Sequence, residues 1–321
     1  MAETPIVTSA ETREEPKRHP FLIELVIRLI KDKPLGVVGA FIVLVLLFAG
    51  IFADILAPFG YNNIHLADRL SGPSAQYILG TDNLGRDLLS RVIYGARISI
   101  IVGLSGSFLN SIIGIIIGGT SGYFGGKTDL IIQRFVDASY AVPTLFLVLT
   151  IMSIVGPGIW QVIFVIGLAR GLHCRTERSL VIGIKENLYI QAARSIGAPP
   201  IKIFIRHIVP NVMPGLIIIF SMSLGSVILY ESTLSFLGFG IPPPVPSWGG
   251  MLSGPGRQFM IVAPWMALWP GLALALVVYG ANMLGDAMRD LLDPRLRGGL
   301  GRYGGVEKER AKRAAKAGVT S

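Results

Sequence analysis

The residues of this chain that could carry chemistry are few, and they do not assemble into a catalytic pattern. The stretch GGKTD at 125–129 resembles the end of a phosphate-binding loop, but Ser121 stands where that pattern requires glycine, and no strand precedes it. The four histidines are widely separated, and neither a zinc-protease motif nor a pair of carboxylates within the apolar runs is present. We therefore predict no catalytic residue, no metal site and no cofactor bound by this chain.

The elements that surround these residues are strongly apolar. The 321-residue chain is 51% hydrophobic and 15% charged, with a mean hydropathy of +0.60, whereas soluble domains carry roughly 25% charged residues. Its uncharged runs are long enough to cross about 30 Å of hydrocarbon, and Gly156-Pro157-Gly158 predicts a turn that divides the longest run. We predict an all-α integral membrane protein with six transmembrane helices, at about 35–55, 98–119, 138–155, 159–175, 210–231 and 263–286.

The distribution of positive charge orients these spans. If the N-terminus is cytoplasmic, the inner segments are 1–34, 120–134, 170–209 and 287–321, and they contain 24 of the 29 Lys and Arg residues. Cytoplasmic loops carry such an excess, so both termini are predicted to be cytoplasmic. The net charge of +9 then reflects membrane topology and gives no reason to expect a nucleic-acid partner.

The regions outside the spans have distinct compositions. Residues 1–19 are polar and predicted to be disordered, whereas 20–34 form an apolar helix lying at the membrane interface. Residues 298–321 form a basic cytoplasmic tail. Two long outer segments, 57–96 and 232–262, either cap the bundle or meet a partner outside.

The stretch NLYIQAARSIGAPPIKIFIRHIVPN at 187–211 is amphipathic and broken in the middle. Gly197 ends a first helix, and Pro199-Pro200 can begin a second. This pattern predicts a helix–turn–helix on the cytoplasmic side, which either docks a partner or rests on lipid. Apolar residues recur with helical spacing in both halves: Tyr189, Ala192, Ala193 and Ile196, then Ile201, Phe204, Ile205 and Ile208.

Small and polar residues inside the predicted spans have two interpretations. They either pack helices together or line a wet cavity on a translocation pathway. The candidates are Ser107 and Asn110 in the second span, Ser221, Met222 and Ser223 in the fifth, and Asn282 in the sixth.

On the outer side, Arg86 and Asp87 precede the second span, and Phe236 and Phe239 lie in the rigid stretch SFLGFGIPPP. These residues either form local turns and caps, or they gate the outer mouth and contact an external partner.

Four ordered motifs resemble one family of transporters. YIQAARSIG, followed by Ile203, His207 and Pro210-Asn211, resembles the EAA loop of ABC importer permeases, with Gln191 in place of the family's glutamate. The stretches at 79–104 (LGTDNLGRDLLSRVIYGARISIIVGL), 231–252 (ESTLSFLGFGIPPPVPSWGGML) and 285–297 (GDAMRDLLDPRLR) resemble the dipeptide/oligopeptide/nickel branch. The resemblance covers nearly all of residues 20–297 and is greatest to the C-type permease subunit of a dipeptide system.

The resemblance implies a type I ABC importer permease fold over 35–297, with a coupling loop at about 187–209, in a prokaryotic inner membrane. Its implied partners are a second, homologous permease, two ATPase subunits that bind ATP and Mg, an extracytoplasmic solute-binding protein and membrane lipid. Di- or oligopeptides are the expected solute, and a nickel chelate, glutathione, an opine or a sugar is the alternative. An ATP-independent channel or secondary carrier is the competing class. The implied ATPase-coupling residues are Tyr189, Gln191, Ala192, Ala193, Arg194 and Gly197.

Overall fold

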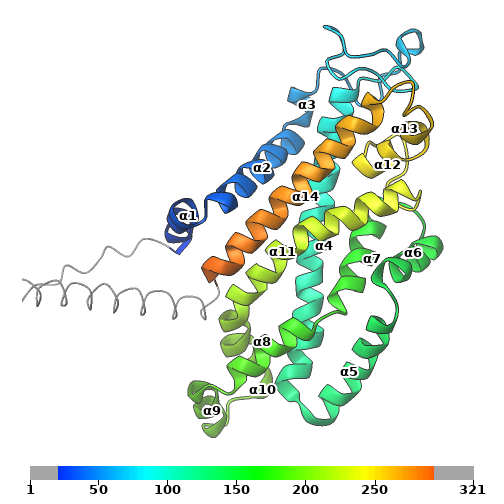
Figure 1. Ribbon diagram of the computed structural model, residues 1–321. Helices are drawn as coiled ribbons and strands as arrows, with labels where there is room; N and C mark the ends of the chain where they lie inside the picture. The colour runs from blue at the N-terminus through cyan, green and yellow to red at the C-terminus, as the bar shows by residue number, and fades with distance from the viewer. Residues whose placement is uncertain (1–20, 293–321) are drawn as a thin grey trace, which may run out of the picture.

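A computed structural model of the protein describes residues 21–292 as a bundle of helices (Figure 1). Within that range the secondary structure is helical apart from one isolated β-bridge between Thr81 and Asp87, which confirms the predicted all-α class. The predicted disordered segment at 1–19 and the basic tail at 298–321 lie outside the described residues.

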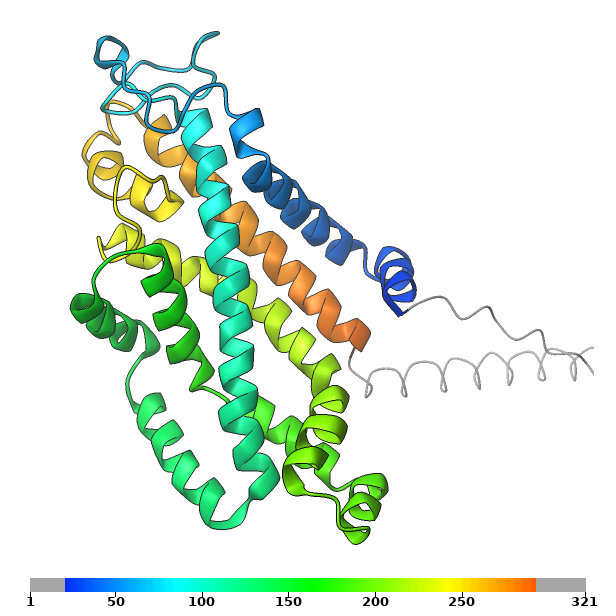
Figure 2. The ribbon, with the colours of Figure 1, turned by 180° about the vertical axis from the view of Figure 1, so that it is seen from behind.

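The longest helix, α4 (Leu88–Phe124), runs the length of the bundle, and the other apolar helices pack around it (Figure 2). On one side α4 contacts α2 (Pro34–Ile51) and α11 (Val209–Phe236), and α14 (Trp265–Leu292) packs against both of these helices. On the other side α4 contacts α7 (Ile159–Gly171).

Among the described residues, four helices are long and apolar enough to cross a membrane: α2, α4, α14 and the continuous stretch Pro200–Phe236. A fifth crossing is made if α5 (Gly126–Ala141) and α6 (Thr144–Val155) together form one broken span. Helix α7 is apolar but has only 13 residues. A multi-pass membrane protein is therefore confirmed, and the count of six spans stays a prediction.

The helix expected over 138–155 is not continuous. It is broken after Val142, and α5 and α6 meet at 90°. Pro143 lacks a backbone N–H and constrains the residue before it, so the helix ends there and restarts at Thr144. The predicted turn at Gly156–Gly158 is confirmed, because α6 ends at Val155 and α7 begins at Ile159.

Helix α4 begins ten residues before the predicted second span because the arginines of its first turns find partners. Arg97 donates to the carbonyl oxygen of Gly50 (2.9 Å) and pairs with Asp54 in α3 (Ala53–Leu56) at 2.8 Å. Arg91 is buried and donates to the carbonyl oxygen of Tyr61 (2.9 Å). Charges paired in this way allow the helix to extend beyond its uncharged run.

The N-terminal helices pack against the end of α14. Helix α1 (Phe21–Asp32) carries an ion pair between Arg28 and Glu24, one turn apart. Lys33 joins α1 to α2 and pairs with Asp290 of α14 at 2.5 Å. A Cβ atom added at Gly39 would lie 2.6 Å from the carbonyl oxygen of Gly280, so the two helices approach as closely as they do because both residues are glycine.

The bundle has two different ends (Figure 1). At one end lie the loop 57–87, with a short 3-10 helix at Leu66–Asp68, and the short helices α12 (Trp248–Leu252) and α13 (Gly254–Gln258). At the opposite end lie the α4–α5 turn, α8 (Arg175–Lys185), α9 (Leu188–Ser195) and α10 (Pro200–Ile203).

Candidate functional site

The segment from α9 to α10, which we call the α9–α10 bracket, is built as two helices joined by a tight turn, as predicted. Gly197 adopts φ +78°, the left-handed region that glycine favours. The Gly197 N–H donates to the carbonyl of Arg194 (2.9 Å), and the Ala198 N–H donates to the carbonyl of Ala193 (3.1 Å). These two bonds are a Schellman motif, which satisfies the last carbonyls of α9 and reverses the chain.

The bracket is anchored to the bundle by one apolar cluster. Ile190 and Ala193 of α9 are buried there together with Tyr123 of α4 and Val181 of α8. The remaining buried members come from the second helix and the start of α11, namely Ile203, Phe204, Ile208, Val212 and Leu216. The Arg194 guanidinium lies 5.4 Å from the Tyr123 ring centroid, which adds a cation–π contact. The bracket is therefore held against the bundle by apolar contacts within this chain.

The apolar face predicted for the bracket is only partly the buried one. Ala193, Phe204 and Ile208 are buried as expected, but Tyr189, Ala192, Ile196, Ile201 and Ile205 are exposed. Leu188 is 82% exposed and Ile196 is 85% exposed. An apolar surface is thus left uncovered on α9, at the tip of the molecule.

The two polar coupling candidates on α9 have contacts within this chain. The Gln191 side-chain amide donates to the carbonyl oxygen of Glu186 (3.2 Å), just before α9. Arg194 lies over Tyr123, as described above.

The second helix of the bracket continues directly into α11. A π-helical turn at Phe204–Ile208 links α10 to α11, so that Pro200–Phe236 forms one helical stretch. Such turns are rare and occur mostly as single-turn bulges, frequently at functional sites. The bracket is therefore joined without a loop to a helix of the bundle.

A pocket of about 480 Å³ opens between α4, the α7–α8 junction, α11 and α14; we call it the Arg170 pocket. It brings together three of the predicted pathway residues, Asn110, Met222 and Ser223. Of the other three, Ser107 is fully buried, Ser221 is buried and donates to the Ile217 carbonyl (2.8 Å), and Asn282 lies against Gly225. These three do not line the pocket.

Sequence reasoning missed the charged lining of this pocket. Arg170 and Arg289 lie at the last turns of α7 and α14, and neither was predicted to line a pocket: Arg170 was counted only among the inner positive charges, and Arg289 was also assigned to a helix-end capping group. The residues that complete the lining are Arg170, His173, Thr176, Glu177, Ile218, Ile219 and Arg289.

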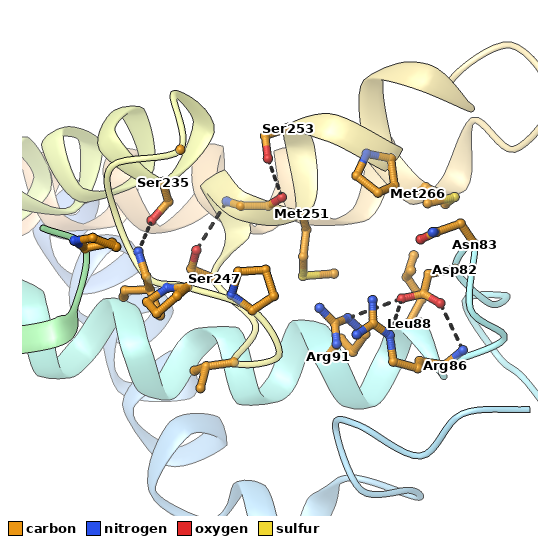
Figure 3. A pocket seen from close by; sticks show the side chains of 18 residues that line it. Asp82, Asn83, Arg86, Leu88, Arg91, Ser235, Ser247, Met251, Ser253 and Met266 are labelled. Atoms are coloured by element: carbon orange, nitrogen blue, oxygen red, sulfur yellow. Dashed lines mark hydrogen bonds and ion pairs between the residues drawn. The ribbon is translucent and has the colours of Figure 1, made fainter. Parts of the chain in front are cut away.

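A second pocket, of about 300 Å³, lies at the opposite end of the bundle; we call it the Asp82 pocket (Figure 3). Asp82 is buried and accepts hydrogen bonds from the backbone N–H groups of Leu84 (2.8 Å) and Arg86 (3.0 Å). Its carboxylate also pairs with Arg86 at 2.7 Å and lies 3.6 Å from Arg91. Ser235, in the last turn of α11, and Ser247, just before α12, face the same pocket.

The predicted outer residues have different positions. Arg86 lines the Asp82 pocket, whereas Asp87 caps α4 by accepting from the Ser90 N–H (2.7 Å) and the Ser90 hydroxyl (2.6 Å). Phe236 and Phe239 are partly exposed and do not line the Asp82 pocket.

The GGKTD stretch forms the turn between α4 and α5. Gly125 and Gly126 have positive φ, and Lys127 is exposed. Asp129 accepts a bidentate pair from Arg178 of α8, at 2.7 and 2.5 Å. The stretch therefore has a structural role in fixing α8. Within residues 21–292 no cluster of His, Cys, Asp or Glu with metal-binding geometry is present.

Comparison with known proteins agrees with this fold. Residues 110–298 match the family model described as the inner membrane component of binding-protein-dependent transport systems, and residues 22–73 match the N-terminal transmembrane domain of oligopeptide transport permease C. The chain therefore belongs to the binding-protein-dependent transport system inner membrane component family, and it is a multi-pass inner-membrane protein.

Two relatives indicate its place in that family. The chain is 38% identical to the dipeptide transport system permease protein DppC of Alkalihalophilus pseudofirmus, over 84% of this chain and 88% of the relative. It is 37% identical to the glutathione transport system permease protein GsiD of Escherichia coli, over 84% of this chain and 90% of the relative. A solved structure of the MetNI methionine ABC transporter, facing inward, matches with a TM-score of 0.50 and 17% identity, covering 63% of this chain and 96% of that one, and supports the fold alone.

Proposed function

We propose that this chain is a non-catalytic permease subunit of an ATP-driven importer, and that α9 is the element that docks on a separate ATPase subunit. ATP and Mg would be bound by that partner. The observation that carries the proposal is the uncovered apolar surface of α9. Leu188 and Ile196 project from a helix whose other face is fixed in the bundle. Burying an exposed Leu or Ile contributes about 1.5–3 kcal/mol, so these two residues would supply much of a docking contact.

The geometry also supports a route by which a movement of α9 would reach the rest of the bundle. Helix α9 packs on α4 and α8 through one apolar cluster that also contains Ile203 of α10, and α10 continues through the π-helical turn into α11. A displacement of α9 would therefore be passed to α11 as a rigid movement, because the shared apolar cluster and the hydrogen-bonded turn at Gly197 hold α9 against α10. Tyr189, Gln191, Ala192, Ala193, Arg194 and Gly197 stay the proposed coupling residues, with Ala193 acting inside the bracket and Ala192 at its surface.

The remaining parts of the complex follow from the family. A second, homologous permease would complete the pathway, two ATPases would sit under the α9 end, and a solute-binding protein would meet the loops at the other end. Arg86, Asp87, Phe236 and Phe239 are proposed to act at that outer mouth. Ser107, Asn110, Ser221, Met222, Ser223 and Asn282 are proposed to line or support the pathway.

A short peptide is the solute that the relatives favour, because their names specify dipeptide and glutathione, which is itself a tripeptide. A nickel chelate, an opine or a sugar would use the same machinery and stays the alternative.

The test compares two surface substitutions in the reconstituted complex. Leu188→Asp combined with Ile196→Asp should leave the permease in the membrane but abolish most solute-stimulated ATP hydrolysis and uptake. The matched control is Leu188→Ile combined with Ile196→Leu, which keeps both exposed positions apolar and should hydrolyse ATP and import solute as the wild type does. ATP hydrolysis and uptake at wild-type rates in the double aspartate variant would refute the docking role.

A further inference from the structure

The Arg170 pocket has cationic groups that the described part of the chain does not neutralise. The Arg170 guanidinium lies 5.5 Å from the Tyr230 ring centroid, and its buried Nε atom has no hydrogen-bond partner. Neither Arg170 nor Arg289 forms an ion pair with another residue of the range 21–292. Arginine has five N–H donors arranged to hold a carboxylate or phosphate in two parallel bonds.

His173 offers the complementary group. Its ring stacks on Tyr140 with 4.1 Å between centroids. The other nitrogen, Nε2, is buried and has no partner. In a neutral imidazole one ring nitrogen accepts a hydrogen bond, so the unpartnered Nε2 can take one from a ligand N–H group.

Glu177 is the one carboxylate in the pocket lining, and it is only 3% exposed. Its Oε1 atom lies against α4, 2.4 Å from where a Cβ atom of Gly114 would be. Burial raises the pKa of Glu177, and its carboxylate does not pair with Arg170. The arginines of the lining therefore outnumber its acid, and Asn110, Thr176 and Ser223 add only neutral polar groups.

Leaving buried polar atoms without partners costs about 1–3 kcal/mol each, so native structures rarely do so without a reason. Here a guanidinium nitrogen and an imidazole nitrogen, from two residues that line one pocket, are both buried and unsatisfied. The pocket volume of about 480 Å³ is within the range of small-molecule sites. A ligand that gives both side chains a hydrogen-bond partner needs a pair of anionic oxygens for the guanidinium and an N–H donor for the imidazole.

We propose that the Arg170 pocket binds the transported solute itself, as an amino-acid or short-peptide molecule whose carboxylate is held by Arg170 and whose N–H group donates to His173. This rests on the proposed import function and specifies the substrate class within it. Arg289, on α14, faces the same space and adds a second positive charge. The site selects peptide-type solutes over neutral sugars by this charge.

The proposal can be tested on the purified complete complex without its binding protein, with radiolabelled Ala-Ala as the probe. Wild-type complex should bind Ala-Ala saturably, and Ala-Ala-amide, which lacks the carboxylate, should compete about tenfold or more less well. Glucose should not compete. Arg170→Gln should weaken Ala-Ala binding by about tenfold or more and remove the preference for the acid over the amide.

The matched control is Arg134→Gln, which removes an exposed cation that lies 3.8 Å from Asp137 and does not line the pocket; it should bind as wild type. Equal competition by Ala-Ala and Ala-Ala-amide on wild-type complex would overturn the proposal without any variant. A preference for Ala-Ala over Ala-Ala-amide that persists in Arg170→Gln would also overturn the proposal. If the wild-type complex imports solute with its binding protein but binds no Ala-Ala, this inference is refuted and the proposed function stands. If the complex shows no ATP-driven uptake, the proposed function is refuted.

Discussion

The ion pair between Asp129 and Arg178 is predicted to hold α8, and through it the α9–α10 bracket, onto the end of α4 and α5. Asp129 is in the first turn of α5 and accepts from two guanidinium nitrogens of Arg178, at 2.7 and 2.5 Å. The Ser121 hydroxyl of α4 donates to the same carboxylate at 2.5 Å. Replacing Asp129 by Ala removes all three contacts at once.

The expected cost follows from the exposure and geometry of the pair. The side chains of Arg178 and Asp129 are 30% and 21% exposed, so solvent screens their attraction only in part. A hydrogen bond to a charged group contributes about 1.5–3 kcal/mol when buried, and an exposed pair about 0–1 kcal/mol. We therefore expect Asp129→Ala to lower the free energy of unfolding by about 2 kcal/mol, which lies between those limits.

A second pair between the same two helices provides the control. Arg175 and Asp137 also join α8 to α5, at 2.6 Å, but their side chains are 54% and 44% exposed. Asp137→Ala should therefore cost less than about 1 kcal/mol. Thermal unfolding of the two variants in detergent compares them, and the charge swap Asp129→Arg with Arg178→Asp should recover part of the loss. Equal losses for Asp129→Ala and Asp137→Ala would refute the reasoning.

Two further predictions concern buried side chains. Cys174, the single cysteine, is buried. N-ethylmaleimide should therefore label the folded protein far more slowly than the denatured protein at pH 7–8, and fast labelling of the folded protein would contradict this placement. Trp248 is fully buried and its Nε1 donates to the Val92 carbonyl (3.0 Å), so Trp248→Ala should cost about 3–5 kcal/mol in unfolding experiments, and a loss below about 1 kcal/mol would contradict the packing.

Local signals in the sequence were sufficient to predict the bracket but not its orientation. The helical spacing of apolar residues, Gly197 and Pro200 gave its two helices and its turn, all of which the structure confirms. Spacing alone could not separate Ile190, which is buried in the chain's own core, from Ile196, which is left exposed. Both residues are apolar, and only the packing of α9 on α4 and α8 decides which of them faces inward.

Apolar length was a weaker guide to the spans. It located α2, α11 and α14, but it placed one continuous helix over 138–155, where the chain bends by 90° beside Pro143. It also placed the start of α4 too late, because the ion pair between Arg97 and Asp54 joins residues more than forty positions apart. Such partners are visible only once the helices are packed.

The Arg170 pocket could not be predicted from the sequence for the same reason. Its lining comes from α4, the α7–α8 junction, α11 and α14, which are distant in the chain. Asn110, Met222 and Ser223 could be selected because they are polar or polarisable residues within apolar runs. Arg170 and Arg289 lie at helix ends, where positive charge is expected for topology and capping, so nothing in the sequence pointed to a pocket.

The central claim is that α9 is in contact with an ATPase subunit, and site-specific photo-crosslinking tests it most directly. A photoreactive phenylalanine at position 196 should capture the ATPase subunit in membranes that contain the complete complex, whereas the same group at position 261, at the other end of the bundle, should not. Capture of the ATPase from position 261, or of lipid alone from position 196, would contradict the account.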